Sequence, residues 1–341
     1  MVLPFSAISA EKQGELGFST SNTIKTFAGI RNPMSTSFTR RSLLKNTASL
    51  FGAATLLKPL DVLAANRAES EDVWAFASDM HLSDWTTQPP EYNTRFQSVV
   101  AAMLAEPVKP RRVFLLGDTI ASGKPEQYRR LVETLQPLVD AGIAIHVSLG
   151  DHDHRGHFQA IRRQLLPPEK KDESIAHIVR TEPWLDGEVK HLEIIETPRA
   201  SFFVLDSLDK VNHEEGKFGN NQLDWLAAEL DQRKDRPAIL MAHHPAVDVR
   251  NSGLSDSIPF WELVGSRPQV KAYFFGHTHF WINYRLGRIH QVNFPATSRC
   301  ATLTVLGWVL MTLSDDGASL TLKTCNPNDS RNGRKTPLRW V

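Results

Sequence analysis

Two histidines near the C-terminal end of the sequence have the type and spacing to bind metal. His277 and His279 stand two residues apart, directly after the apolar run of residues 270–275. On an extended strand, residues i and i+2 point to the same side, so both imidazole rings can reach one point in space. Neutral imidazole is the commonest metal ligand in proteins. A Gly-His-x-His pattern also arises by chance, so the prediction of a metal site depends on partners elsewhere in the chain.

Four more groups of potential ligands follow apolar runs, each where a strand is expected to end. The apolar runs are residues 73–77, 113–116, 143–149 and 238–242. The groups that follow them are Asp79 with His81, Asp118, Asp151 with His152, and His243 with His244. Helical patterns at residues 92–104 and 125–139 separate the first three runs, which indicates parallel strands buried on both faces. Ligands of such sheets bind at the carboxyl ends of the strands, so we expect these side chains to lie together.

The second half of the chain has shorter elements. We expect a helix at residues 222–230 and strands at residues 175–180, 191–195, 201–205, 289–294, 302–313 and 319–323. A loop rich in Asp, Ser, Asn and Gly is expected to extend to about residue 258. Residues 314–317, Ser-Asp-Asp-Gly, are typical of a hairpin turn. Because no repeat or linker interrupts residues 66–341, we expect one domain there.

The ordered set of motifs resembles the calcineurin-like metallophosphoesterase superfamily. That family carries D-x-H, G-D, G-N-H-D/E, H and G-H-x-H in this order, and the resemblance covers about residues 73–313. It implies an α/β fold, a four-layer α/β/β/α sandwich with two mixed sheets and a dinuclear metal site at the C-terminal ends of the strands. Further residues resemble the class III cyclic-nucleotide phosphodiesterase branch: Arg155, Phe158, Gly219 and residues 205–207 and 222–226.

The resemblance also implies which residues bind metal. One ion is expected on Asp79, His81 and His279, a second on Asp151, His243 and His277, with Asp118 bridging both. Carboxylate and imidazole without thiolate suit Mn, Fe or Zn ions, divalent or trivalent. The absence of a tyrosine after Asp118 argues against an iron–tyrosinate site. The family's reaction is hydrolysis of a phosphoester by metal-bound hydroxide, and His152 resembles the histidine that contacts substrate and protonates the leaving group.

One ligand position departs from the family pattern. Asp151 stands where the family has Asn, which adds a negative charge beside the second ion. We expect an exported phosphoesterase that acts on diesters. The alternatives are a phosphomonoesterase of the same fold and a metal-binding module with little catalytic activity, in which Asp151 impairs turnover. A second question is which of His243 and His244 binds metal; alignment with His-x-Pro relatives favours His243, with His244 behind it.

Charge and composition narrow the class of partner. Lys and Arg total 39 against 38 for Asp and Glu, so no whole-protein field attracts nucleic acid or a membrane surface. The sequence also lacks a basic stripe for nucleic acid. Together with the resemblance to metallophosphoesterases, which implies the substrate class, this makes a small-molecule phosphoester the expected partner. Two cysteines exclude a disulfide scaffold and a Cys-rich zinc site.

The first 65 residues resemble a bacterial twin-arginine signal peptide. Arg40 and Arg41 precede a weakly apolar run at residues 47–57, and small residues 62–65 offer a cleavage site. The run is too short for a stable membrane span, which needs about 20 residues. Met34 lies just before the arginine pair, so residues 1–33 are a possible gene-model extension. We expect export by the twin-arginine machinery to the periplasm or outside the cell; the alternative is an amphipathic N-terminal helix of a cytosolic enzyme.

Overall fold

A computed structural model of the chain describes residues 72–83, 91–168, 175–184, 187–247, 252–299 and 304–341. The predicted signal segment, residues 1–65, lies outside these residues. Within the described ranges, no helix combines the length and the apolar character that a membrane crossing requires.

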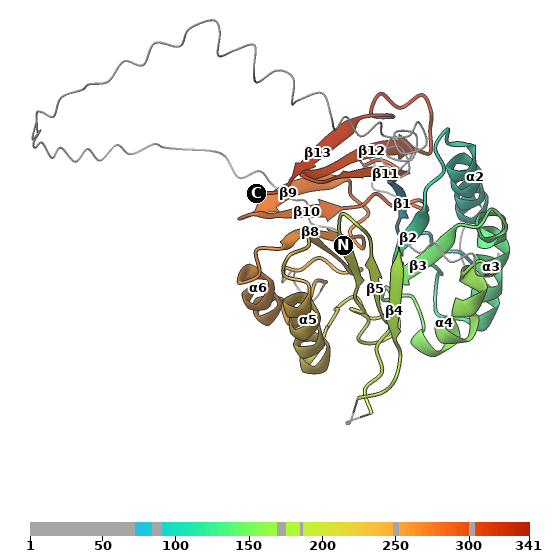
Figure 1. Cartoon of the computed structure of the whole chain (residues 1–341). Coiled ribbons are helices and arrows are strands. Elements are labelled where there is room, and N and C mark those ends of the chain that lie inside the picture. Colours follow the sequence, from blue (N-terminus) through green and yellow to red (C-terminus); the bar gives the residue numbers. More distant parts are fainter. Residues whose placement is uncertain (1–71, 84–90, 169–174, 185–186, 248–251, 300–303) are drawn as a thin grey trace, which may run out of the picture. The chain divides into compact units, whose positions relative to one another are not determined.

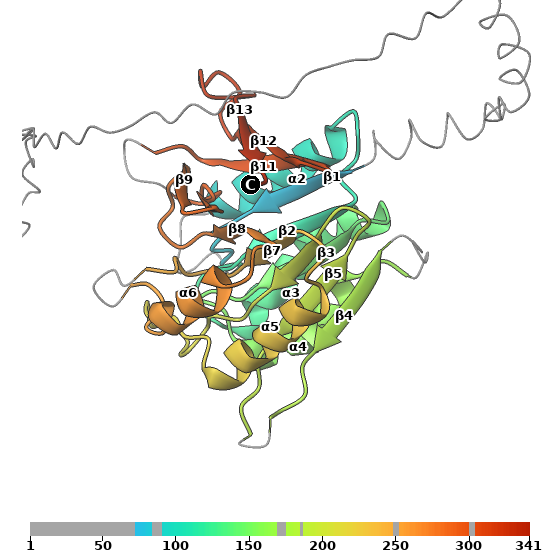
Figure 2. The same cartoon turned by 60° about the vertical axis from the view of Figure 1, so that its left-hand side comes forward.

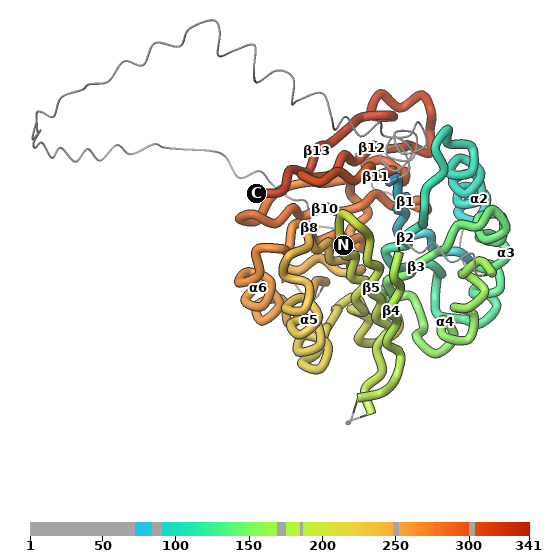
Figure 3. Tube along the Cα trace, viewed as in Figure 1, coloured from blue at the N-terminus to red at the C-terminus, as the bar shows by residue number. Residues whose placement is uncertain are grey.

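The first sheet has six strands in the order β13-β12-β11-β1-β2-β3. Its strands are β1 (Val73–Ala77), β2 (Arg112–Leu116), β3 (Ala144–Ser148), β11 (Gly307–Ser314), β12 (Gly317–Thr324) and β13 (Lys335–Arg339). β1, β2 and β3 pair in parallel, as the sequence predicts, whereas β11 pairs antiparallel with β1. Segments far apart in the sequence, β1 in blue and β11 in red, therefore lie side by side (Figure 3). The predicted hairpin is also confirmed, because Ser314 pairs with Gly317 across a two-residue turn.

The second sheet has seven strands in the order β4-β5-β6-β7-β8-β10-β9. Its strands are β4 (Ala176–Arg180), β5 (Leu192–Glu196), β6 (Ser201–Val204), β7 (Ala238–Met241), β8 (Val270–Phe275), β9 (Ile282–Leu286) and β10 (Ile289–Asn293). β6, β7, β8 and β10 run parallel, and β4, β5 and β9 pair antiparallel with their neighbours. Both sheets are thus mixed.

Helices cover the outer faces of the two sheets. α2 (Glu91–Ala105), α3 (Pro125–Asp140) and α4 (Arg155–Ile161), which a 3-10 turn (Arg162–Leu165) follows, share a buried cluster with the first sheet. α5 (Asn220–Gln232) and α6 (Ser257–Gly265) share another with the second sheet. A third cluster fills the space between the sheets. Figures 1 and 2 show these layers from two directions, and they confirm the expected four-layer sandwich.

Side chains of β1 alternate between two buried clusters, one on each face of the first sheet. Successive residues of a strand point to opposite faces. Trp74 and Phe76 face the second sheet, where the rings of Trp74 and Phe202 lie 4.6 Å apart. Ala75 and Ala77 face the helices. The sequence did not predict α4, α6, β9 or β13; α6 and α4 are only nine and seven residues long, too short for a clear helical period.

Candidate metal centre

The predicted ligands all follow strands at the same end of the two sheets. Asp79 follows β1, Asp118 follows β2, Asp151 follows β3, His243 follows β7 and His277 follows β8. These five strands run parallel within their sheets, so their carboxyl ends deliver the side chains together. The structure brings all seven predicted metal ligands and His152 into neighbouring groups.

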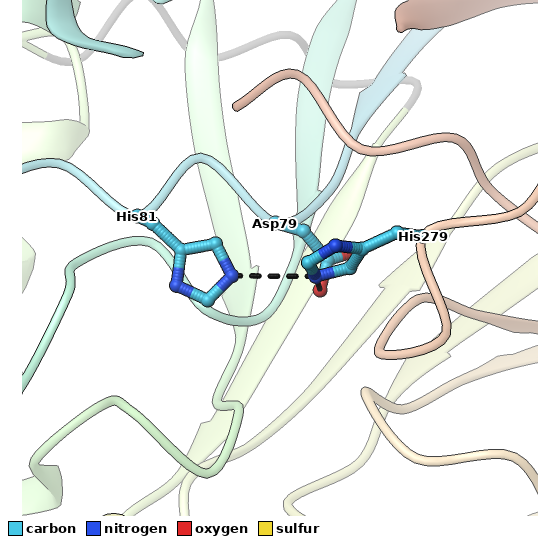
Figure 4. A group of neighbouring side chains, drawn as sticks. All are labelled: Asp79, His81 and His279. Carbon is cyan, nitrogen blue, oxygen red and sulfur yellow. Dashed lines mark hydrogen bonds and ion pairs between the residues drawn. The ribbon is translucent and has the colours of Figure 1, made fainter. Parts of the chain in front are cut away.

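The first group consists of Asp79, His81 and His279. His279 Nε2 lies 3.3 Å from Asp79 Oδ1 and 3.4 Å from His81 Nε2, and Figure 4 shows the two rings and the carboxylate turned toward one another. Asp79 Oδ2 is buried without a hydrogen-bond partner in the described part of the chain. A buried carboxylate oxygen without a partner is costly, and a cation at this point would satisfy it.

The second group consists of Asp151, His243 and His277. Asp151 Oδ1 lies 3.2 Å from His243 Nε2 and 3.1 Å from His277 Nδ1. The same two ring nitrogens are 3.2 Å apart. The three donor atoms therefore form a small triangle that can hold one ion.

Asp118 lies between the two groups. Its Oδ2 is 3.6 Å from His81 Nε2 of the first group and 3.4 Å from His243 Nε2 of the second. Its Oδ1 accepts a hydrogen bond from the backbone N–H of His152 at 3.0 Å, which fixes the plane of the carboxylate. One Asp118 oxygen is therefore placed to contact ions in both groups.

The donor set fits two metal ions. Donors about 2.0–2.2 Å from one ion stand roughly 3 Å apart, and the separations within the two groups are 3.1–3.4 Å. The atoms are carboxylate oxygens and imidazole nitrogens, the ligands of Mn, Fe and Zn. The structure therefore presents two adjacent candidate metal sites that share one carboxylate.

Hydrogen bonds to the second ring nitrogen orient two of the histidines. His243 Nδ1 donates to the carbonyl oxygen of Leu116 at 2.7 Å, which turns Nε2 toward the centre, as is usual for ligating histidines. His244 differs: its Nδ1 contacts Ser207 Oγ at 2.8 Å and its Nε2 is 3.9 Å from Asp151 Oδ1. His243 is thus a member of the ligand group, and His244 lies behind it.

Burial and charge act in opposite directions on the pKa values of the ligands. Burial lowers the pKa of His81 to about 4, even though Asp118 opposes the shift, so this ring is neutral at pH 7. Burial also lowers the pKa of His243, but Asp118 and Asp151 raise it well above its usual value. Metal binding must therefore displace a proton from His243.

Five ligand residues adopt a left-handed backbone conformation. Positive φ angles occur at Asp79 (53°), His81 (46°), Asp118 (50°), His277 (65°) and His279 (62°). Only one other non-glycine residue of the described chain, Asn212, has a positive φ. Such a conformation costs of order 1–3 kcal/mol per residue and is retained where the surroundings impose it, commonly at functional sites. No residue type in the sequence indicates this feature.

His152 and Asp153 have different positions in the loop after β3. His152 Nδ1 donates to the Ala121 carbonyl at 2.8 Å, and its Nε2 lies 3.5 Å from Asp151 Oδ2 in a side chain that is 29% exposed. Asp153 is buried, accepts hydrogen bonds from Thr119 Oγ1 at 2.5 Å and from the Gly150 N–H at 2.9 Å, and belongs to none of the ligand groups. Burial raises the pKa of Asp153 to about 6. Asp153 anchors the loop, and His152 points its Nε2 toward Asp151 of the second ligand group.

One contact of the centre has no counterpart in the sequence interpretation. Ser252 Oγ lies 3.0 Å from His277 Nε2 and so fixes the orientation of that ring. Ser252 stands in a loop rich in similar residues, and no local pattern distinguishes it.

The fold and the ligand groups define a metallophosphoesterase, and comparison with known proteins agrees. Residues 75–280 match the model of the calcineurin-like phosphoesterase family, to which the chain belongs. It is therefore a metal-dependent phosphoester hydrolase. A Nostoc protein named 3',5'-cyclic-nucleotide phosphodiesterase is 26% identical over 64% of this chain and 76% of its own length.

One further relative and one solved structure are similar to the chain. A Rhodococcus erythropolis protein named probable cyclic nucleotide phosphodiesterase is 28% identical over 46% of this chain, which spans 45% of that relative's length. The crystal structure of a dimetal phosphatase from Danio rerio has the same fold, with a TM-score of 0.56 and 13% identity over 80% of this chain and 99% of that one.

A substitution at Gly150 tests whether close packing holds Asp118 and His243 together. A Cβ atom at this position would lie 2.3 Å from Asp118 Oδ1 and 2.9 Å from His243 Cδ2. We expect Gly150→Ala to weaken Mn²⁺ binding about 10- to 100-fold, the range found when the support of metal ligands is disturbed. Calorimetric titration measures the affinity, and circular dichroism checks that the fold is kept. Gly265→Ala is the control, since a Cβ there meets nothing within 4 Å; equal affinities in both variants would contradict this account.

Proposed function

We propose that the chain is a dinuclear phosphodiesterase that hydrolyses a small-molecule phosphoester. The observation that carries the proposal is the position of Asp118 Oδ2 between two groups that each contain a carboxylate and two imidazoles. A pair of ions about 3.5–4 Å apart is the arrangement that serves in-line displacement at phosphorus.

The chain's residues divide between the two ions as their groups indicate. Asp79, His81 and His279 would hold one ion, Asp151, His243 and His277 the other, and Asp118 would contact both. Mn, Fe and Zn ions all suit these donors. When bound, the ions supply positive charge for the phosphate and make water more acidic.

Charge at the centre favours a diester over a monoester. Two divalent ions with Asp79, Asp118 and Asp151 leave a formal charge of about +1. A phosphodiester carries one negative charge and a monoester approaches two, so the additional carboxylate of Asp151 disfavours the monoester more. The names of the two relatives described above, a probable cyclic nucleotide phosphodiesterase and a 3',5'-cyclic-nucleotide phosphodiesterase, support the same preference.

A comparison of two chromogenic substrates tests this preference. We expect kcat/KM for bis(p-nitrophenyl) phosphate to exceed that for p-nitrophenyl phosphate by about tenfold or more with Mn²⁺, Fe²⁺ or Zn²⁺. Asp151→Asn should reduce the ratio of the two kcat/KM values. It should also shift the acidic limb of the pH–rate profile to lower pH, because removal of the Asp151 charge makes the attacking water easier to deprotonate.

The substrate comparison also distinguishes the phosphodiesterase from the two alternative functions. A reversed preference would favour the phosphomonoesterase. Two bound ions without turnover of a broad phosphoester panel would favour a metal-binding module. An acidic limb that does not move in Asp151→Asn would contradict the charge argument itself.

We further propose that His152 donates a proton to the leaving group. Its Nδ1 is held by the Ala121 carbonyl, so Nε2 is the atom that faces Asp151 and the ligand groups. Proton donation matters most when the leaving oxygen is strongly basic, as in an alkoxide, and little for p-nitrophenolate.

The leaving-group dependence of a His152 variant tests that role. We expect His152→Ala to lower kcat by about 10²–10⁴-fold on an alkyl phosphodiester, and far less on bis(p-nitrophenyl) phosphate. His157→Ala is a matched control, because His157 Nδ1 makes a similar contact with the carbonyl of Gly123 but belongs to none of the ligand groups. An equal loss on both substrates would show that His152 acts by positioning or binding rather than by proton transfer.

Export of the enzyme is a proposal that rests on the sequence. Arg40 and Arg41, the apolar run after them and the small residues at 62–65 support a twin-arginine signal. We expect replacement of both arginines by lysine to retain the full-length chain in the cytoplasm of a bacterial host, measured by cell fractionation. Arg67→Lys, just beyond the expected cleavage site, is the control, and unchanged export of the paired variant would refute the signal.

A further inference from the structure

A second cluster of histidines surrounds a buried carboxylate and shares no residue with the metal centre. Glu193 of β5 is 2% exposed and His146 of β3 is 1% exposed. His146 Nδ1 and His177 Nε2 both lie 2.6 Å from Glu193 Oε2. His191 Nε2 lies 2.7 Å from the other oxygen, Oε1. Three imidazoles thus meet one carboxylate inside the fold.

We propose that His146, His177 and Glu193 form a third metal site, which binds one zinc ion. Their donor atoms lie within 4.8 Å of one another. Two imidazole nitrogens and one carboxylate oxygen are a known set of protein ligands for zinc, with a fourth position left for water. This inference goes beyond the proposed function and does not rest on it.

His191 orients the carboxylate for this role. The amide nitrogen of Gln159 can only donate, and it lies 3.1 Å from His191 Nδ1. His191 Nδ1 is therefore the acceptor, and the Nε2–H donates to Glu193 Oε1. This bond leaves Oε2 facing His146 and His177. Hydrogen bonds that hold a ligating carboxylate in place are a regular part of metal sites.

The two 2.6 Å distances to Glu193 Oε2 correspond to the state without an ion, in which protons on His146 and His177 point at the carboxylate. A separation of 2.6 Å is that of a charge-assisted hydrogen bond from a ring N–H to Glu193 Oε2. Around zinc the same donors stand about 3.3 Å apart, so the ion requires them to separate by several tenths of an ångström. Each ring must then have no proton on the nitrogen that binds the ion, His146 Nδ1 and His177 Nε2. His146 Nε2 is buried without a partner in the described residues, so its tautomer change opposes binding, and the metal–ligand bonds must exceed this cost.

The location gives the ion both an entry route and a structural role. His177 has a side chain that is 20% exposed, so solvent reaches the cluster. It lies on β4, the edge strand of the seven-stranded sheet, whereas His146 lies on β3, the edge strand of the six-stranded sheet. One ion held by both would join the two sheets at these edges. The site is therefore expected to stabilise the fold rather than to act on phosphate.

Metal counting on matched variants tests the third site. The purified chain is stripped with chelator, loaded with Zn²⁺, desalted and analysed by mass spectrometry of the metal. We expect His177→Ala to hold one zinc ion fewer per chain than the wild type, with phosphoester turnover unchanged. His213→Ala, which removes an exposed histidine, should match the wild type. Equal zinc content in His177→Ala and the wild type would overturn the proposal and identify the cluster as a hydrogen-bond network.

A second measurement tests the third site independently of whether the dinuclear centre binds metal. In an Asp118→Asn chain, whose shared carboxylate is lost, we expect Zn²⁺ to raise the melting temperature, and we expect a smaller rise in Asp118→Asn/His177→Ala, where only the Asp79 and Asp151 groups remain to bind zinc. A one-ion difference between these two chains supports the third site whatever the dinuclear centre binds. If zinc shifts both melting temperatures equally, the third site is absent. His177→Gln, which keeps a polar side chain at this partly exposed position, replaces His177→Ala if the latter does not fold.

Discussion

The centre depends on the cost of burying three carboxylates close together. Asp79, Asp118 and Asp151 are each 2% exposed or less, and repulsion between them opposes folding unless positive charge lies nearby. In the metal-free chain, a proton held on His243 supplies part of that charge. Metal ions would meet the same need more completely, because they would also neutralise buried oxygens such as Asp79 Oδ2 that have no hydrogen-bond donor among the described residues.

The two-sheet architecture is what allows the carboxylates to meet. Asp79, Asp118 and Asp151 come from the first sheet, and the histidine pair of His243 and His277 comes from the second. Each sheet alone would carry an incomplete set, and the packed aromatic layer between them fixes their relative position. Glycines permit the final approach: a Cβ at Gly276 would lie 1.9 Å from Ser78 Oγ of the other sheet. Packing between the sheets is thus a requirement of the metal chemistry as well as of stability.

The sequence indicates which of these side chains come together because they follow apolar strands. Buried parallel strands give continuous apolar runs, and the polar residues at their ends stand out, as at Gly117 and Asp118. The left-handed backbone of His81 and His279 has no such signal, because it is imposed by tertiary contacts on residues that seldom adopt it. The sequence did not predict the histidine cluster around Glu193 either. It joins single residues from the interior of three strands in two sheets, and spacing along the chain cannot reveal that arrangement.

The central claim is that two ions share Asp118, and anomalous X-ray diffraction from crystals grown with Mn²⁺ tests it most directly. The account predicts two anomalous peaks about 3.5–4 Å apart, one beside Asp79, His81 and His279 and one beside Asp151, His243 and His277, with Asp118 in contact with both. A single peak at this centre, or two peaks without a shared Asp118 ligand, would contradict it.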